Sequence, residues 1–212
     1  MDTNNNNKLK TGTTTVGIIC KDGIVMAADR RATAGNYIVD KSVTKVIKIN
    51  EDIVLTMAGT VSDAQLLIKL IRAELQLRKL KTNRKPTMKE TANLLSSMVY
   101  NNIRYAGGIT HFLIGGKDSS GYHVYDIYMD GSITKIDDFV SSGSGSVIVW
   151  GVLETSYSKD ITIKEGIKLI THAVNAALQR DSASGGGITV YSITEDGVKK
   201  EIDKLIKIDL NE

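Results

Sequence analysis

Two consecutive apolar segments near the N-terminus constrain the fold of this chain more than any other feature. Residues 13–20 are rich in β-branched side chains, and residues 24–29 are apolar at almost every position. Because Lys21-Asp22-Gly23 between them has the composition of a tight turn, the sequence predicts a β-hairpin. Strands of this composition have no polar face to expose, so the hairpin is expected to be buried on both sides within a layered structure.

The elements predicted after this hairpin do not follow a regular β-α-β alternation. Apolar residues at helical spacing predict helices that begin near Ser62, Thr87 and Thr162, each with the Ser/Thr-x-x-Glu/Gln signature of a capping box. A glycine-containing turn is expected at residues 115–118. The other strand-like segments are residues 44–49, 53–58, 111–114, 122–128, 132–136, 188–193 and 198–202. This order predicts an α+β layered sandwich in one domain rather than a doubly wound parallel sheet.

Composition and charge exclude several classes of function. The 27 basic and 24 acidic residues are scattered along the chain, so nucleic-acid binding through a basic patch is not expected. Cys20 is the only cysteine, which excludes a disulfide framework and a Cys-based metal site and fits a cytoplasmic setting. No run of about 18 apolar residues occurs, so no membrane span is expected. The sequence predicts no metal site and no cofactor.

Familiar catalytic motifs are also missing from the sequence. The three histidines, His111, His123 and His172, lie far apart and are expected at the surface, and no serine has a Gly-x-Ser-x-Gly context. The glycine-rich segment at residues 143–146 matches neither a dinucleotide-binding nor a Walker pattern. These observations argue against a Ser-His-Asp hydrolase and against nucleotide binding.

The boundary between Gly12 and Thr13 is the strongest candidate for catalytic chemistry. A polar, Asn-rich segment ends there without any apolar stretch typical of a secretory signal. A threonine hydroxyl needs a base, and an N-terminal threonine carries its own in the α-amino group, whose pKa is about 7.7 to 8.0. This chemistry requires removal of residues 1–12 as a propeptide, which would leave residues 13–212 as the catalytic domain. Taken alone, however, the segment is more simply interpreted as a Thr-rich edge strand.

Together with other blocks, this boundary resembles the β subunits of proteasomes, especially archaeal ones. Thr11-Gly12-Thr13-Thr14-Thr15-Val16-Gly17 is similar to the processing site and mature start of that family. The further blocks, in the same order, are Asp29-Arg30-Arg31-Ala32-Thr33, Lys45, Met57-Ala58-Gly59 with Asp63-Ala64-Gln65, Gly143-Ser144-Gly145 and Arg180-Asp181-Ser182-Ala183-Ser184-Gly185-Gly186. The resemblance extends from Thr13 to the C-terminus. It implies a threonine endopeptidase with the four-layer αββα sandwich of N-terminal-nucleophile hydrolases.

The resemblance also implies a role for each residue of the site. Thr13 would be the nucleophile, with Asp29 and Lys45 as the charged pair beside it. A buried lysine cation next to an aspartate would lower the cost of alkoxide character on the hydroxyl or shuttle its proton. The backbone N–H of Gly59 would form the oxyanion hole. The residues implied to hydrogen-bond around the threonine are Ser144, Asp181 and Ser184.

A pocket for the residue before the cut bond follows from the same resemblance. Its implied lining is entirely apolar and consists of Ala32, Val43, Ile47, Met57 and Val61. Such a pocket favours large hydrophobic side chains. Thr33 and Gly59 would offer main-chain hydrogen bonds to an extended substrate. Without the resemblance, core packing explains each of these apolar residues as well.

The expected partners come from the resemblance alone. It implies two stacked homo-heptameric β rings between α-subunit rings, fed with unfolded proteins by a regulatory ATPase acting through the α rings. Two alternatives remain open at this point. The first is the bacterial two-component relative with six-membered rings, which usually starts closer to its mature threonine. The second is a structural ring subunit with a dead site, which would lack the threonine or the lysine.

Overall fold

Two five-stranded sheets lie face to face in this computed structural model, which describes residues 12–206. The first sheet has the order β10-β1-β2-β11-β12, formed by β1 (Thr15–Cys20), β2 (Gly23–Asp29), β10 (Phe139–Ser142), β11 (Gly187–Thr194) and β12 (Gly197–Leu205). The second has the order β5-β6-β7-β8-β9, formed by β5 (Val46–Lys48), β6 (Ile53–Gly59), β7 (Thr110–Asp118), β8 (Gly121–Ile127) and β9 (Ile133–Ile136). Every strand pair described in these sheets is antiparallel.

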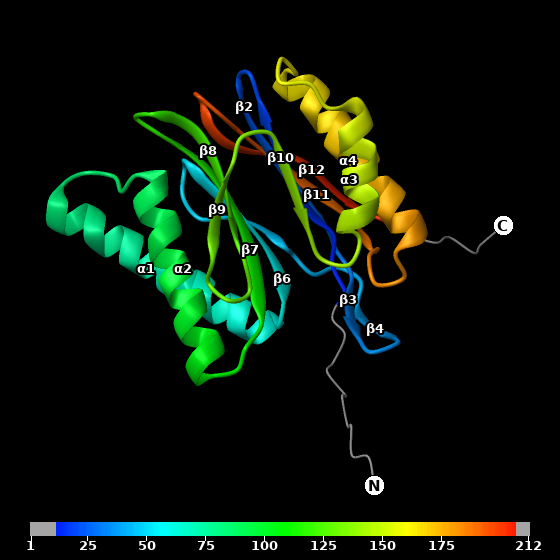
Figure 1. Ribbon diagram of the computed structural model, residues 1–212, viewed down its shortest axis with the longest axis horizontal. Coiled ribbons are helices and arrows are strands. Elements are labelled where there is room, and N and C mark those ends of the chain that lie inside the picture. Colours follow the sequence, from blue (N-terminus) through cyan, green and yellow to red (C-terminus); the bar gives the residue numbers. More distant parts are fainter. Residues whose placement is uncertain (1–11, 207–212) are drawn as a thin grey trace, which may run out of the picture.

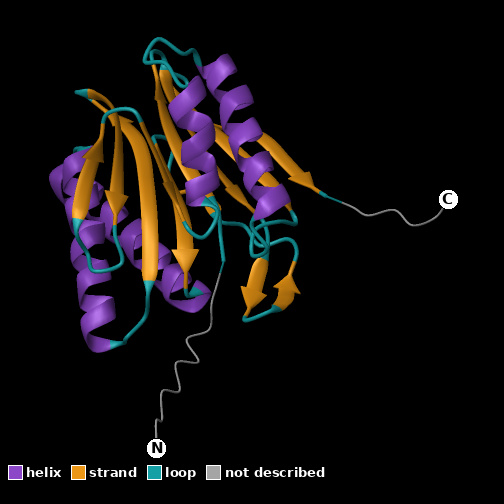
Figure 2. Ribbon diagram, turned by 45° about the vertical axis from the view of Figure 1, so that its right-hand side comes forward, coloured by secondary structure: helices purple, strands orange, loops and turns teal. Residues whose placement is uncertain are grey.

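Helices cover the outer face of each sheet, which produces four layers (Figures 1 and 2). Helices α1 (Val61–Thr82) and α2 (Met88–Tyr105) pack on the sheet that contains β6 and β7. Helices α3 (Ser146–Ser156) and α4 (Ile163–Arg180) pack on the sheet that contains β1 and β2. The predicted α+β sandwich is confirmed. Within residues 12–206, none of the helices combines the length and apolar content that a membrane crossing requires.

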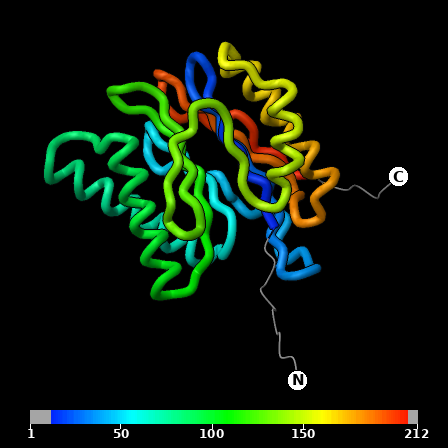
Figure 3. Tube along the Cα trace, in the orientation of Figure 1, coloured from blue at the N-terminus to red at the C-terminus, as the bar shows by residue number. Residues whose placement is uncertain are grey.

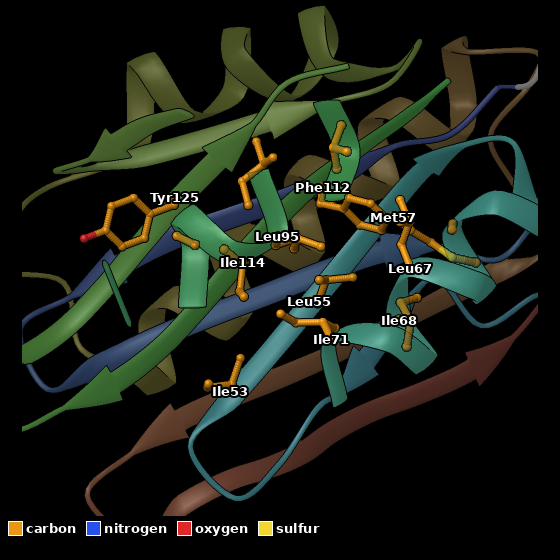
Figure 4. Close-up of a cluster of buried hydrophobic side chains, with 14 of the residues drawn as sticks. Ile53, Leu55, Met57, Leu67, Ile68, Ile71, Leu95, Phe112, Ile114 and Tyr125 are labelled. Atoms are coloured by element: carbon orange, nitrogen blue, oxygen red, sulfur yellow. The ribbon is translucent and has the colours of Figure 1, made fainter. Parts of the chain in front are cut away.

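The apolar residues of β6 show how one strand serves two cores. Leu55 and Met57 point toward α1 and α2, where they join Phe112 of β7 in a cluster of buried side chains (Figure 4). Val54, the residue before Leu55, points to the other sheet and packs in a cluster with Met26 of β2. Because successive side chains of a strand alternate between faces, an apolar strand of this kind fills both the helix–sheet and the sheet–sheet interior.

The local sequence signals were correct for the first hairpin, for the three predicted helices and for two of their three capping boxes. β1 pairs with β2 through the predicted turn, with Cys20 opposite Gly23. Thr87 and Thr162 both form capping boxes, in each of which the side chain of the glutamate three residues later accepts the backbone N–H of the cap residue. The capping box predicted at Ser62 is wrong. α1 begins one residue earlier, and its N-cap Thr60 makes no side-chain capping hydrogen bond.

The glycine-containing turn predicted at residues 115–118 is also wrong, because β7 runs straight through this segment. A Cβ on Gly115 would lie 2.5 Å from Met26 Sδ, and one on Gly116 would lie 2.5 Å from Met88 Sδ. These glycines therefore make room for methionine side chains packed against the two faces of the sheet, and the chain turns only after Asp118.

Besides β10, a hairpin and a helix of the structure had no counterpart among the predictions. The hairpin of β3 (Ala32–Ala34) and β4 (Tyr37–Asp40) forms a separate small sheet at one end of the molecule (Figure 3). α3 follows the glycine-rich segment at residues 143–145, and its sequence is rich in valine, which favours strands. It is nevertheless helical because its buried Val149 and Leu153 pack in one cluster with residues of α4 and β1.

Candidate active site

A buried ion pair joins the ends of two strands from different sheets. Asp29 is the last residue of β2, and Lys45 directly precedes β5. Lys45 Nζ lies 2.7 Å from Asp29 Oδ1, and the two side chains are only 5% and 0% exposed. Burial lowers the pKa of Lys45, and the nearby Asp29 carboxylate opposes this shift.

The carboxylate of Asp29 is saturated by donors from three further segments. Oδ1 also accepts the backbone N–H of Thr14 at 3.0 Å, and Oδ2 accepts those of Arg31 at 3.0 Å and Gly185 at 2.9 Å. These hydrogen bonds compensate for the hydration that a buried carboxylate loses. Asp29 thereby fixes the positions of Lys45, of the segment before β1 and of the loop before β11 relative to one another.

Thr13 lies against this pair with its hydroxyl between Lys45 and the preceding peptide group. Lys45 Nζ donates to Thr13 Oγ at 3.0 Å, and Thr13 Oγ donates to the Gly12 carbonyl oxygen at 2.6 Å. Lys45 Nζ is also 3.4 Å from that carbonyl oxygen. The nucleophile proposed from the sequence, its charged neighbour and the carbonyl of the bond expected to be cut are therefore within hydrogen-bonding reach of one another.

On the other side of Thr13, serine hydroxyls and an aspartate form a hydrogen-bonded chain. The Thr13 N–H donates to Ser144 Oγ at 3.2 Å, and Ser144 Oγ donates to Asp181 Oδ2 at 2.6 Å. Ser184 Oγ donates to the same carboxylate oxygen, also at 2.6 Å. Asp181 caps the C-terminal end of α4, Ser144 precedes α3, and Ser184 lies before β11. Two segments distant in sequence thus hold the backbone nitrogen of Thr13, which bonds Ser144 directly and residues 181–184 through it.

Gly59 ends β6 beside a small pocket that also contains Thr13. Its φ angle is 107°, and a Cβ there would lie 2.2 Å from the Ile109 carbonyl oxygen, so only glycine fits. The pocket is lined by Thr13, Val43, Lys45, Met57, Ala58, Gly59, Val61 and Ala64. Its walls away from Thr13 and Lys45 are apolar.

The structure brings some of the predicted pocket residues together and leaves others elsewhere. Val43, Met57 and Val61 line the pocket. Ile47 does not belong to this lining and instead packs against the buried cluster under α1 and α2. Ala32 is likewise outside it, on β3. Thr33, the next residue of that strand, contacts the site through its side chain, because its Oγ accepts the Gly12 N–H at 3.0 Å.

Reasoning from the sequence missed the backbone N–H of Arg31 and four further residues of the site. Thr14 contributes its N–H to Asp29 and a hydroxyl 2.7 Å from Ser184 Oγ, and Gly185 contributes its N–H to Asp29. Ala58 and Ala64 contribute small side chains to the pocket. All four stand next to or inside blocks that carry the resemblance, which was the only signal available for them.

The histidines lie outside this site, although one prediction about them is wrong. His111 is buried rather than at the surface, with Nε2 2.5 Å from Asp126 Oδ1. His123 is partly buried, and His172 is exposed on α4 as expected.

The fold and the site define a class of protein. A four-layer αββα sandwich with a threonine ahead of its first strand, beside a buried lysine–aspartate pair, is typical of N-terminal-nucleophile hydrolases. Comparison with known proteins narrows this class. A family model described as "Proteasome subunit" matches residues 9–193.

Curated relatives agree with this match. The proteasome subunit beta of Archaeoglobus profundus is 42% identical over 203 residues, covering 94% of this chain and 94% of that protein. That of Archaeoglobus fulgidus is 43% identical over 189 residues, covering 89% and 88%. Proteasome subunit beta 1 of Thermococcus kodakarensis is 42% identical over 200 residues, covering 94% and 97%. This chain belongs to the proteasome subunit family, and this membership implies peptidase activity.

Proposed function

We propose that this chain is the catalytic β subunit of a proteasome core particle and a threonine endopeptidase that first cleaves its own Gly12–Thr13 bond. The observation that carries the proposal is the position of Thr13 Oγ, 3.0 Å from Lys45 Nζ and 2.6 Å from the Gly12 carbonyl oxygen. Residues 1–12 would then be a propeptide, and residues 13–212 the mature catalytic domain.

Self-cleavage begins with attack of Thr13 Oγ on the carbonyl carbon of Gly12. The nitrogen of Thr13 is an amide at this stage, so Lys45 accepts the hydroxyl proton; burial lowers its pKa and favours the neutral amine. The new O–C bond replaces the C–N bond, and the proton passes to the departing Thr13 amine. Water then hydrolyses the ester, which releases a leader ending in the Gly12 carboxylate and restores the Thr13 hydroxyl.

Turnover of substrates uses the amine that this cleavage creates. The α-amino group of Thr13 accepts the hydroxyl proton directly or through water, because its pKa of about 8 suits a general base near neutrality. The acyl-enzyme forms on Thr13 Oγ while the Gly59 N–H stabilises the developing oxyanion. Water then releases the product. Ser144, Asp181 and Ser184 hold the amine in place.

The apolar lining of the pocket beside Thr13 supports a preference for cleavage after hydrophobic residues, and the family resemblance adds the preference for large ones. Val43, Met57 and Val61 offer no charge to pair with a basic or acidic side chain. A polar side chain entering this space would lose hydration without gaining a partner. Backbone groups of Thr33 and Gly59 would hold the substrate as an added strand.

Assembly would follow the relatives, which are named as proteasome subunits beta. The chain would form heptameric β rings, stacked in pairs between α-subunit rings, in the cytoplasm. A regulatory ATPase acting through the α rings would deliver unfolded proteins. A ring of six subunits, as in the bacterial two-component relative, is the alternative, and symmetry in negative-stain images separates the two.

The decisive experiment is mass spectrometry of assembled Thr13→Ala particles. We expect this variant to keep residues 1–12 and to hydrolyse no peptide, since it lacks the nucleophile of both reactions. Thr15→Ala is the matched control, because the Thr15 hydroxyl is also buried but bonds Ser142 instead of Lys45. A Thr13→Ala particle that matures or cuts peptides would refute the mechanism. Wild-type particles that assemble but never cleave would indicate the structural subunit with a dead site.

A further inference from the structure

The backbone of Gly12 is held at both its N–H and its carbonyl group before cleavage. Its carbonyl oxygen accepts the Thr13 hydroxyl, and its N–H donates to Thr33 Oγ at 3.0 Å in a buried hydrogen bond. Thr33 is 8% exposed. Its hydroxyl therefore meets the leader in an environment where water competes poorly for the hydrogen bond.

The strand that carries Thr33 is fixed to the catalytic carboxylate. Only Arg30 and Arg31 separate Asp29 from β3, and the Arg31 N–H donates to Asp29 Oδ2 at 3.0 Å. The other oxygen of this carboxylate holds Lys45. Asp29 thus ties the acceptor for the Gly12 N–H to the amine that approaches the Gly12 carbonyl.

Such an anchor matters because glycine is the least restrained residue of the backbone. Without a partner for its N–H, Gly12 could rotate its carbonyl away from Thr13 Oγ at little cost. A hydrogen bond that fixes the reacting groups removes this rotational freedom before the chemical step. After cleavage, the Gly12 N–H leaves with the leader, so this contact of the Thr33 hydroxyl exists only in the precursor.

We infer that the Thr33 hydroxyl is a positioning residue for self-processing: it orients the Gly12 carbonyl toward Thr13 Oγ, and it contributes less to turnover of substrates. This inference rests on the proposed function and deepens it. The main chain of Thr33, proposed above to bind substrates, is the same in every variant below. The side chain and the backbone of one residue therefore serve two successive reactions of the same nucleophile.

The test compares Thr33→Val, which keeps the shape but loses the hydroxyl, with Thr33→Ser, which keeps the hydroxyl. Each variant is made as the full precursor in assembled particles, and intact-mass spectrometry follows the appearance of chains that begin at Thr13. Each is also made as a fusion cut by another protease directly before Thr13, and kcat/KM for an apolar peptide is measured. These two measurements separate positioning of the leader from general damage to the site.

We expect Thr33→Val to slow processing about 10-fold, the effect of one buried hydrogen bond whose donor is left unpaired. Thr33→Ser should process within about twofold of the wild type, and kcat/KM of the pre-cut Thr33→Val chain should fall by a smaller factor than its processing rate. Processing of Thr33→Val at the wild-type rate overturns the inference, as does an equal loss in both measurements. If Thr33→Val does not assemble, Thr33→Ala replaces it with the same criteria.

Processing of the wild-type precursor distinguishes a failure of the proposed self-cleavage from a failure of the role inferred for Thr33. A wild-type particle that never yields a chain starting at Thr13 overturns the proposed self-cleavage together with this inference. A wild-type particle that matures while Thr33→Val matures equally fast overturns the inference alone.

Discussion

The two sides of the Gly12–Thr13 bond differ in the chemistry of the residues that surround them. On one side, which we call the closed side, Ser144, Asp181 and Ser184 form a hydrogen-bonded chain, and Ala183 lies directly against Gly12. On the other, the open side, apolar residues including Val43, Met57 and Val61 surround a small pocket. Lys45 reaches the reacting atoms between the two sides.

This difference separates what the site does to its own chain from what it does to substrates. A Cβ on Gly12 would lie 1.7 Å from Ala183 Cβ, so the closed side admits no side chain before the bond that we propose is cut during maturation. The open side offers apolar walls to the corresponding side chain of a substrate. In the proposed mechanism, one nucleophile would thus cut after glycine once, and after large apolar residues thereafter.

Removal of Lys45 should give the largest effect, because both sides depend on it. We expect Lys45→Met to slow processing and peptide hydrolysis by about 10³-fold each, a typical loss for a group that moves a proton in the transition state. Leaving Asp29 buried without its partner should also destabilise the chain by about 3 kcal/mol. Mass spectrometry, peptide hydrolysis and thermal unfolding measure the three effects.

Lys48→Met is the matched control for this variant. Lys48 lies on β5 close to Lys45 in sequence, but its partner Glu51 is exposed. An exposed ion pair contributes at most about 1 kcal/mol. If Lys45→Met retained more than a tenth of either activity, the central role of this amine would be refuted.

The closed side is tested next by Gly12→Ala. We expect processing to slow about 100-fold, since the new methyl group must displace Ala183. Adding Ala183→Gly should restore part of the rate. The rescue should be incomplete because the Ala183 Cα would remain only 2.9 Å from the new Cβ. Ala183→Gly alone is the control, and a Gly12→Ala precursor that matures normally would remove the distinction between the two sides.

On the open side, Val61→Asp should change which substrate side chains are preferred, with a smaller effect than that of Gly12→Ala. Val61 lines the pocket in the first turn of α1, where a carboxylate is favourable to the helix. We expect kcat/KM for cleavage after large apolar residues to fall about 10-fold. Processing should be unchanged, since Gly12 places no side chain in the pocket. Leu66→Asp, on an exposed position of α1, is the control, and equal losses in both variants would contradict the assignment of the pocket.

The smallest expected effect is a difference in pH dependence between the two reactions. Burial places the pKa of Lys45 below its ordinary value of 10.5, so the neutral amine that starts processing becomes more abundant as pH rises toward that pKa. We expect processing to accelerate with rising pH until Lys45 is fully neutral, whereas turnover, which depends on an α-amine of pKa about 8, should change less than about twofold between pH 8 and 9. Superimposable rate profiles would mean that one base serves both reactions.

Short-range signals predicted the fold where the decisive contacts are local. The first hairpin and the capping boxes at Thr87 and Thr162 depend on residues within a few positions of each other. Predictions failed where distant residues decide. Gly115 and Gly116 carry the composition of a turn but accommodate Met26 and Met88 within a continuous strand, and the valine-rich α3 is helical because of its packing against α4.

By itself, the sequence determined the chemical groups and their order: a glycine before a threonine, then Asp29 and Lys45, within strands too apolar to be exposed. Only the tertiary structure decided how those groups meet. Pairing of β1 with β2 brings Thr14 to Asp29, and the packing of the two sheets buries Lys45 beside both. Burial lowers the pKa of Lys45. Contacts with Thr33 and Ala183 distinguish the surroundings of the Gly12–Thr13 bond from those of a substrate bond. These properties depend on distance and desolvation, which arise only when segments remote in sequence pack together.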